Sequence, residues 1–338
     1  MYKCKDCGAP LSRKTAKRCV DCYRKSVAAK FSNGESLESR ELNSAIVHAI
    51  KEELSKIPAP PTAAKESAKS GDTLVIHLSD LHAGKEVKDQ DGKTIYNGRI
   101  FKERINIFIS QVLKLLDNNI VKGVPITDAV ILSTGDNANG ENIYETQVYE
   151  QELTPPRQVM LVVETYCKLI KALLARGLKV SFYGCKGNHG RLSKEADPAS
   201  NWDAMSYLVL DYWSRAILKS NKFSIRYSEE TDYLTLSIRG HRYLIRHIAP
   251  EQGDSPAGRV KINEWARTHK VDAVVYGHWH HFAICDVDGI RVFRGGSLVG
   301  GDSLSESMAK SAEPIQLVWG VNEDRVSTFI YAVDLGGE

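Results

Sequence analysis

The clearest pattern in the sequence is a set of four apolar runs of strand length, each ending in polar residues. These runs cover residues 73–78, 129–134, 180–185 and 271–276. Segments with the apolar spacing of amphipathic helices lie among them, at residues 101–116, 158–175 and 202–218. Strands that alternate with helices favour parallel pairing, so the pattern predicts an α/β fold.

The pattern changes after residue 222, where short segments alternate between apolar and polar positions. Alternation at period two is typical of strands with one buried face. Residues 239–241 have the character of a hairpin turn between two of these strands. We expect a second, more antiparallel sheet from residues 223–227, 233–238, 242–246, 282–286, 290–293, 315–318 and 326–333.

The N-terminal fifth of the chain is organised differently. Apolar residues recur every fourth position from Leu42 to Leu54, which predicts a helical segment within residues 31–57. This helix could form a stalk or dimerise the chain, which leaves a homo-oligomer open. Prolines then break the pattern and predict an exposed linker at residues 58–71. The main domain is expected at residues 72–338.

The charge distribution singles out residues 1–30. The whole chain carries +3, but this stretch holds nine Lys and Arg residues and two Asp residues, a net +7, which leaves −4 for the remainder. Concentrated basic charge favours an anionic partner. The composition, 42% hydrophobic and 26% charged, is that of a soluble globular protein. Neither a membrane-spanning run nor a signal-peptide core is evident, so we expect a cytoplasmic protein that does not enter membranes.

Four cysteines lie within this basic stretch as two Cys-x-x-Cys pairs: Cys4 with Cys7, and Cys19 with Cys22. Two such pairs can close a tetrahedral structural zinc site, so we predict a zinc ribbon at residues 1–30. A disulfide framework is disfavoured without a secretory signal, and a redox motif would need only one pair. The basic residues could neutralise nucleic-acid phosphates, or form a solvated or protein-docking face.

Residues with metal-ligand chemistry follow each of the four apolar runs. Ligands in α/β sheets bind beyond the carboxyl ends of the strands, so these side chains are expected to meet at one rim. Oxygen and imidazole ligands without thiolate suit Mn, Fe, Zn or Mg. In chain order the residues are Asp80 and His82, Asp136, Asn188 and His189, and His278 and His280.

This series resembles the calcineurin-like metallophosphoesterase superfamily. The family's motifs run Asp-x-His, Gly-Asp, Gly-Asn-His, a lone His after a strand, and Gly-His-x-His. All five occur here in that order, with His247 as the lone His, and the resemblance covers residues 71–338. It implies a four-layer αββα sandwich. The N-terminal ribbon loosely resembles those of phage and mobile-element proteins, and residues 296–302 resemble phage-borne relatives, so a phage-type member is expected, acting in the host-cell cytoplasm.

The resemblance also implies a ligand set for two divalent ions. The first ion would be held by Asp80, His82, Asp136 and His280. The second would be held by Asp136, Asn188, His247 and His278. His241 is the only rival to His247, but it falls in the expected hairpin turn.

His189 is expected, by the same resemblance, to be the general acid for the leaving oxygen; the alternative is a hydrogen-bonding neighbour of the ligands. In the phosphoprotein-phosphatase branch an Asp orients this His, and an Arg comes directly after that Asp. Here those positions are Asn139 and Gly140, which argues against a protein phosphatase. Arg191 is a candidate contact for the substrate phosphate.

The sequence therefore predicts a dinuclear metal-dependent phosphodiesterase or nuclease, with manganese favoured. Nucleic acid, DNA above RNA, is the expected substrate because the basic ribbon accompanies the metal motifs. A nucleotide or cyclic-nucleotide phosphodiesterase and a phosphomonoesterase remain alternatives. A scaffold protein whose ribbon carries the function is a further alternative from a different class.

Overall fold

The computed structural model describes residues 2–11, 71–118, 125–194, 201–301 and 313–336, together with residues 18, 19, 21, 22 and 25. The helical segment expected at residues 31–57 lies outside the described residues, as does the expected linker up to residue 70. The chain divides into two compact units, Met1–Ser67 and Ala68–Glu338, and each is described by itself.

The first sheet of the larger unit is built on parallel strands. Its order is β15-β14-β3-β6-β7-β8, in which β3, β6, β7 and β8 are parallel, and β14 and β15 pair antiparallel at one edge. All seven residues of β3 are buried, as expected for a central strand covered on both faces. The strands are β3 (Asp72–Leu78), β6 (Ile126–Ser133), β7 (Lys179–Gly184), β8 (Phe223–Tyr227), β14 (Ile315–Val321) and β15 (Ile330–Asp334).

The second sheet has the order β12-β13-β11-β10-β9 and is mixed. Its hairpins β9/β10 and β12/β13 are antiparallel, but β10/β11 and β11/β13 are parallel. Arg239 and Gly240 alone form the β9–β10 turn, with φ values of 50° and 90°, so His241 already belongs to β10. The strands are β9 (Tyr233–Ile238), β10 (His241–Arg246), β11 (Ala273–Tyr276), β12 (Ala283–Val287) and β13 (Ile290–Arg294).

The assignment of strands to sheets corrects the sequence-based expectation in part. The strands at residues 223–227, 315–318 and 326–333 were expected in the second sheet, but β8, β14 and β15 extend the first. The last of them also begins later than expected, at Ile330. Period-two alternation shows that one face of a strand is buried, but it carries no information on the neighbour with which the strand pairs.

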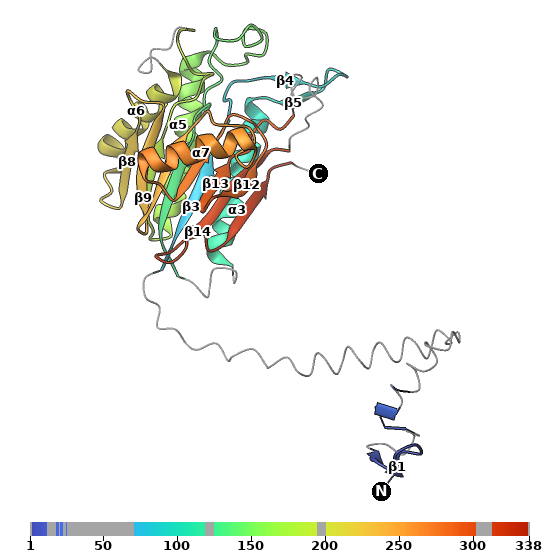
Figure 1. The fold of residues 1–338 in the computed structure, drawn as a ribbon. Coiled ribbons are helices and arrows are strands. Elements are labelled where there is room, and N and C mark those ends of the chain that lie inside the picture. Colours follow the sequence, from blue (N-terminus) through green and yellow to red (C-terminus); the bar gives the residue numbers. More distant parts are fainter. Residues whose placement is uncertain are drawn as a thin grey trace. The chain divides into compact units, whose positions relative to one another are not determined.

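Helices cover the outer face of each sheet (Figure 1), and three separate apolar clusters define the layers. One cluster lies between the first sheet and α3, α5 and α6, and includes Ile76 and Phe108. A second joins the two sheets through residues such as Trp319 and Phe293, and a third joins the second sheet to Ile262 of α7. The predicted αββα sandwich is therefore confirmed. The helices are α3 (Gly98–Asp117), α5 (Pro155–Ala175), α6 (Trp202–Trp213) with its π-helical extension η1 (Ser214–Leu218), and α7 (Pro256–His269).

Two small hairpins complete the described elements. In the N-terminal unit, β1 (Tyr2–Lys3) pairs with β2 (Pro10–Leu11), and in the larger unit β4 (Val87–Lys88) pairs with β5 (Thr94–Tyr96). Within the described residues, no helix has the length and apolar character that crossing a membrane requires.

Candidate metal centre

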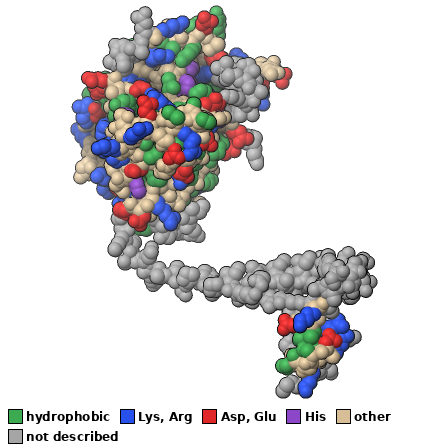
Figure 2. Space-filling model, in the orientation of Figure 1, with side chains coloured by type: hydrophobic (Ala, Val, Ile, Leu, Met, Phe, Trp, Pro, Cys, Tyr) green, Lys and Arg blue, Asp and Glu red, His purple; other side chains and the backbone are tan. Residues whose placement is uncertain are grey.

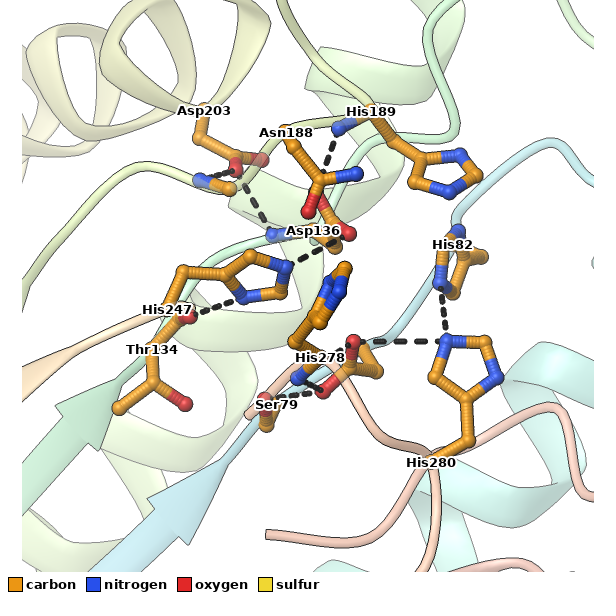
Figure 3. A network of polar contacts seen from close by, with 12 residues as sticks. Ser79, His82, Thr134, Asp136, Asn188, His189, Asp203, His247, His278 and His280 are labelled. Atoms are coloured by element: carbon orange, nitrogen blue, oxygen red, sulfur yellow. Dashed lines mark hydrogen bonds and ion pairs between the residues drawn. The ribbon is translucent and has the colours of Figure 1, made fainter. Parts of the chain in front are cut away.

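The strand ends that the sequence singled out meet at one place. Three of the polar loops follow β3, β6 and β7 of the first sheet, and two follow β10 and β11 of the second. Figure 3 shows their side chains gathered from both sheets around a common space. Ligand atoms lie within 4.8 Å of one another in three groups: Asp80, His82 and His280; His82, Asp136 and His189; and Asp136, His247 and His278.

Backbone strain concentrates at this site. Nine non-glycine residues in the described part of the chain have a positive φ, and five of these are expected ligands. Each left-handed residue costs about 1–3 kcal/mol, so such conformations persist only where surrounding contacts impose them. The strained residues of the site are Asp80, His82, Asp136, His278 and His280.

Two glycines allow the β6 and β7 loops to touch. A Cβ on Gly135, which has a φ of 90°, would lie 2.4 Å from the backbone nitrogen of Gly187. A Cβ on Gly187 would lie 2.0 Å from Oδ1 of Asp136. Any side chain at either position would therefore push apart the loops that carry Asp136 and Asn188.

One half of the site is formed by Asp80, His82 and His280. The Asp80 carboxylate accepts the Ser79 hydroxyl and the backbone N–H of His278, and lies 3.5 Å from Nε2 of His280. The two Nε2 atoms of His82 and His280 are 3.1 Å apart. Burial, together with the charges of His189 and His280, holds the pKa of His82 well below its usual range, so this ring is neutral and able to coordinate.

The other half contains Asp136, His247 and His278. Nδ1 of His247 lies 2.7 Å from the carbonyl oxygen of Thr134, which can only accept, so the ring donates there and directs Nε2 at Asp136. Nε2 lies 2.9 Å from Oδ2 of Asp136, but the contact lacks hydrogen-bond geometry, and both buried atoms have no hydrogen-bond partner. A metal ion bound between them, in place of the proton that the metal-free ring carries, would satisfy both atoms.

Asn188 presents its amide oxygen in the same manner. Its Nδ2 donates to the Tyr144 hydroxyl at 2.7 Å, which fixes the orientation of the amide. The Oδ1 atom is then buried with no hydrogen-bond partner. Unpartnered buried oxygen and nitrogen atoms are costly in an apoprotein, and a divalent metal ion would satisfy those of Asn188, Asp136 and His247.

Asp203 holds these loops in place, although it was not singled out from the sequence. The carboxylate is fully buried and accepts four backbone N–H groups at 2.9–3.1 Å. Burial raises the pKa of Asp203 to about 6, an effect that the charge of Asp136 increases. At its place in the first turn of α6, an Asp is most simply interpreted as a helix-terminal residue. The four donors are Asp136, Asn137, Ala138 and Gly187.

His189 and Arg191 lie beside the predicted ligands. The His189 ring is 4.6 Å from the His82 ring, and its backbone N–H donates to Oδ1 of Asp136. The Arg191 Nε donates to the carbonyl oxygen of Asn188, which brings the guanidinium to the edge of the site. Asn139 contacts Nδ1 of His82 at 3.3 Å.

His247 and its rival His241 lie at opposite ends of β10. The Nε2 atom of His241 lies 3.0 Å from the carbonyl oxygen of Asn322, at the opposite end of β10 from His247. His77 is buried in β3, where its Nε2 contacts the Thr134 hydroxyl and its Nδ1 has no hydrogen-bond partner.

The cysteines of the N-terminal unit form a separate group. The four sulfur atoms lie within 4.8 Å of one another, and the Cys7 and Cys19 sulfurs are 3.4 Å apart, too far for a disulfide. The pKa of Cys22 is raised to about 12, first by its contacts with the Cys7 and Cys19 thiols. This crowding is compatible with the predicted zinc ribbon. Five of the nine basic residues in this stretch lie outside the described residues: Arg13, Lys14, Lys17, Arg24 and Lys30.

Replacing Asp203 tests whether this carboxylate supports the centre. Asp203→Asn turns an acceptor into a donor that faces backbone N–H groups, so Mn²⁺ affinity should fall by roughly 10–100-fold and the melting temperature should drop. Calorimetric titration and thermal unfolding measure the two effects. Asp211→Asn on the same helix, which removes a partly exposed ion pair with Arg215, is the matched control and should change neither. Wild-type affinity in Asp203→Asn would contradict the assigned role.

Metal binding should also depend on pH through His247. Burial lowers the pKa of His247, but the charges of Asp136 and Asp80 outweigh it and raise the pKa to about 9. The metal-free ring therefore carries a proton below pH 9, and a cation must displace it. The apparent affinity for Mn²⁺ should rise by about tenfold per pH unit as the pH approaches 9. Calorimetry in buffers of different ionisation enthalpy counts the released protons, and binding without proton release would refute the assignment.

Comparisons with known proteins place this geometry in a family. Residues 73–282 match the model of the calcineurin-like phosphoesterase family. No curated protein matches the chain.

Several solved structures match over most of the larger unit. Zinc-bound Vps29 from Entamoeba histolytica is 14% identical, with a TM-score of 0.37, and the match covers 78% of this chain and 99% of that one. A novel archaeal phosphodiesterase is 14% identical, with a TM-score of 0.37 and coverages of 77% and 99%. A predicted phosphoesterase from Streptococcus pneumoniae is 13% identical, with a TM-score of 0.29 and coverages of 78% and 99%.

The family match spans the motif-bearing loops from Asp80 to His280, and it extends over more than half of the chain. The three buried ligand groups described above lie within the matched residues, while β13, β14 and β15 of the two sheets follow them in the chain. The chain therefore belongs to the calcineurin-like phosphoesterase family and is a metal-dependent phosphoric ester hydrolase.

Proposed function

We propose that this protein is a phosphodiesterase that hydrolyses nucleic acid, with DNA as the favoured substrate, by means of two divalent metal ions. The observation that carries the proposal is the position of Asp136, which belongs both to the group with His82 and to the group with His247 and His278. A carboxylate shared between two ligand groups suits a pair of ions that clamp a phosphodiester.

The two ions would take the ligands expected from the sequence. Asp80, His82, Asp136 and His280 would hold the first, and Asp136, Asn188, His247 and His278 the second. Mn²⁺ is favoured by this mixture of oxygen and imidazole donors, with Fe, Zn and Mg as the other candidates. When bound, the ions would supply Lewis acidity and an activated water for attack on phosphorus.

The remaining groups would act on the substrate directly. Arg191 is anchored by its Nε to the Asn188 carbonyl, so a phosphate at the centre lies within the region that its guanidinium can reach. The His189 ring packs between His82 and Tyr144, at ring distances of 4.6 Å and 4.7 Å, and would donate a hydrogen bond to the phosphate or its leaving oxygen.

Charge supports nucleic acid over a small nucleotide. Residues 1–30 carry +7 while the rest of the chain carries −4. On the face shown in Figure 2, acidic and basic side chains are mixed over the larger unit. Because the rest of the chain has no net positive charge, a basic zinc ribbon would supply the attraction to a polyanion.

A substrate panel with Mn²⁺ tests the proposal. DNA and bis-p-nitrophenyl phosphate should be hydrolysed faster than cyclic nucleotides, phosphomonoesters and phosphopeptides. Asp136→Asn should abolish turnover and reduce the bound metal to one ion or none, because its carboxylate is the shared ligand. Preferred hydrolysis of a monoester or a cyclic nucleotide would replace the proposal with that activity. A protein that binds two ions and turns over none of these substrates would favour the scaffold alternative.

Removing residues 1–70 tests whether polynucleotide binding and diester hydrolysis belong to different parts of the chain. Hydrolysis of a small diester should stay nearly unchanged, because all the catalytic ligands lie beyond residue 79. The Michaelis constant for a long polynucleotide should rise, and the salt dependence of DNA binding should flatten as fewer phosphates are neutralised. Replacing Cys4 and Cys7 with Ser should mimic the truncation if zinc holds the module together. Equal salt slopes for the full-length and truncated proteins would instead assign the ribbon to protein docking.

A further inference from the structure

Gln147 is a buried glutamine whose side chain joins the loop after β6 to His189. Its Oε1 accepts the backbone N–H groups of Ile143 at 2.7 Å and Tyr144 at 2.9 Å. A carboxamide oxygen accepts hydrogen bonds and its nitrogen only donates them. The two backbone donors therefore fix which end of the amide faces which way, without the ambiguity that usually attends a glutamine side chain.

The donor end of this amide points at His189. The Gln147 Nε2 atom lies 2.5 Å from the Asn139 carbonyl oxygen, 3.2 Å from Nδ1 of His189 and 3.3 Å from the His189 carbonyl oxygen. One of its two hydrogens meets Asn139, and the other is directed between Nδ1 and the carbonyl of His189. A proton on Nδ1 would face this N–H group, so Nδ1 must be the acceptor.

The side chain at the position of the phosphatase branch's orienting Asp contacts a different histidine. Asn139 stands where the phosphatase branch has an orienting Asp, but its Oδ1 contacts Nδ1 of His82 at 3.3 Å. The side chain that contacts Nδ1 of His189 is instead that of Gln147, which offers an N–H donor and not a carboxylate. A carboxylate would hold a proton on Nδ1, whereas an amide N–H excludes it.

We propose that Gln147 is a positioning residue that holds the His189 ring as its Nε2–H tautomer, so that His189 acts as a neutral hydrogen-bond donor and not as a general acid. The catalytic part of this inference rests on the proposed phosphodiesterase activity. A neutral donor stabilises charge on the phosphoryl oxygens but cannot readily release its proton to a leaving alkoxide. The leaving oxygen would then depend on the metal site for stabilisation.

The tautomer can be read directly by nuclear magnetic resonance. The experiment records two-bond proton–nitrogen correlations of the imidazole rings in the full-length, ¹⁵N-labelled protein loaded with Zn²⁺. His189→Gln identifies the His189 signals by their loss. We expect the pattern of an Nε2-protonated ring. A ring protonated on Nδ1, on both nitrogens or on neither would overturn the proposal, the last because it would make His189 a metal ligand.

Gln147→Glu tests the cause of that tautomer. The substitution keeps the shape and an acceptor for the backbone N–H groups of Ile143 and Tyr144, but replaces the donor beside Nδ1 with a second acceptor. The His189 proton should move to Nδ1, which the same spectrum detects. An unchanged Nε2–H pattern in a folded variant would show that Gln147 does not set the tautomer.

Gln147→Leu tests the catalytic consequence. Turnover of a diester should fall by roughly a hundredfold through misplacement of His189, while the Michaelis constant and the number of bound Mn²⁺ ions stay unchanged. Gln151→Leu is the matched control, because the Gln151 side chain donates to the Leu153 carbonyl at 3.0 Å in the same loop. Wild-type turnover in Gln147→Leu would refute the catalytic role. An inactive wild-type enzyme would instead refute the proposed function and leave the spectroscopic result standing.

Discussion

The arrangement of the metal centre depends on one buried carboxylate. Asp203 accepts N–H groups from three consecutive residues of the β6 loop and from Gly187 of the β7 loop. Burying a carboxylate is costly, and here burial raises its pKa to about 6, but four charge-assisted hydrogen bonds offset that cost. Those bonds hold the backbone at and after Asp136 and directly before Asn188, so Asp203 ties the loops that carry these two ligands to one carboxylate.

A second set of contacts maintains the strained ligand loops. The β3 and β6 loops run side by side, with the N–H of His82 donating to the Asp136 carbonyl at 2.9 Å and the N–H of Ala83 to the Asn137 carbonyl at 2.7 Å. The carbonyl of Asp80 accepts the Ser297 hydroxyl and the N–H of Leu298, both at 3.0 Å. Left-handed backbone at Asp80, His82 and Asp136 is thus supported by contacts with neighbouring loops, and these ligands are preorganised.

The same logic extends to the side chains. Each of three ligands uses one polar atom to contact the protein and directs the other at the shared space: His247 through the Thr134 carbonyl, Asn188 through the Tyr144 hydroxyl and Asp136 through the His189 N–H. Gln147 would orient His189 in a comparable way, since its amide nitrogen contacts Nδ1 of the ring. The outer contacts therefore decide which atom of each side chain is offered to a metal ion or a substrate.

The sequence by itself indicated the residues whose ligand atoms the structure groups together and, through the apolar runs, that strands deliver them. Asp80, Asp136 and His278 each follow a buried apolar run. A polar residue directly after such a run is a signal that neighbouring sequence positions carry. The pairing of β8, β14 and β15 and the roles of Asp203 and Gln147 were decided only by the tertiary structure. Asp203 acts on residues 65 to 67 positions away and 16 positions away, and Gln147 acts on a ring 42 positions away. Hydrogen bonds to backbone groups leave no periodicity or motif in the sequence, so their partners become visible only when the loops are brought together.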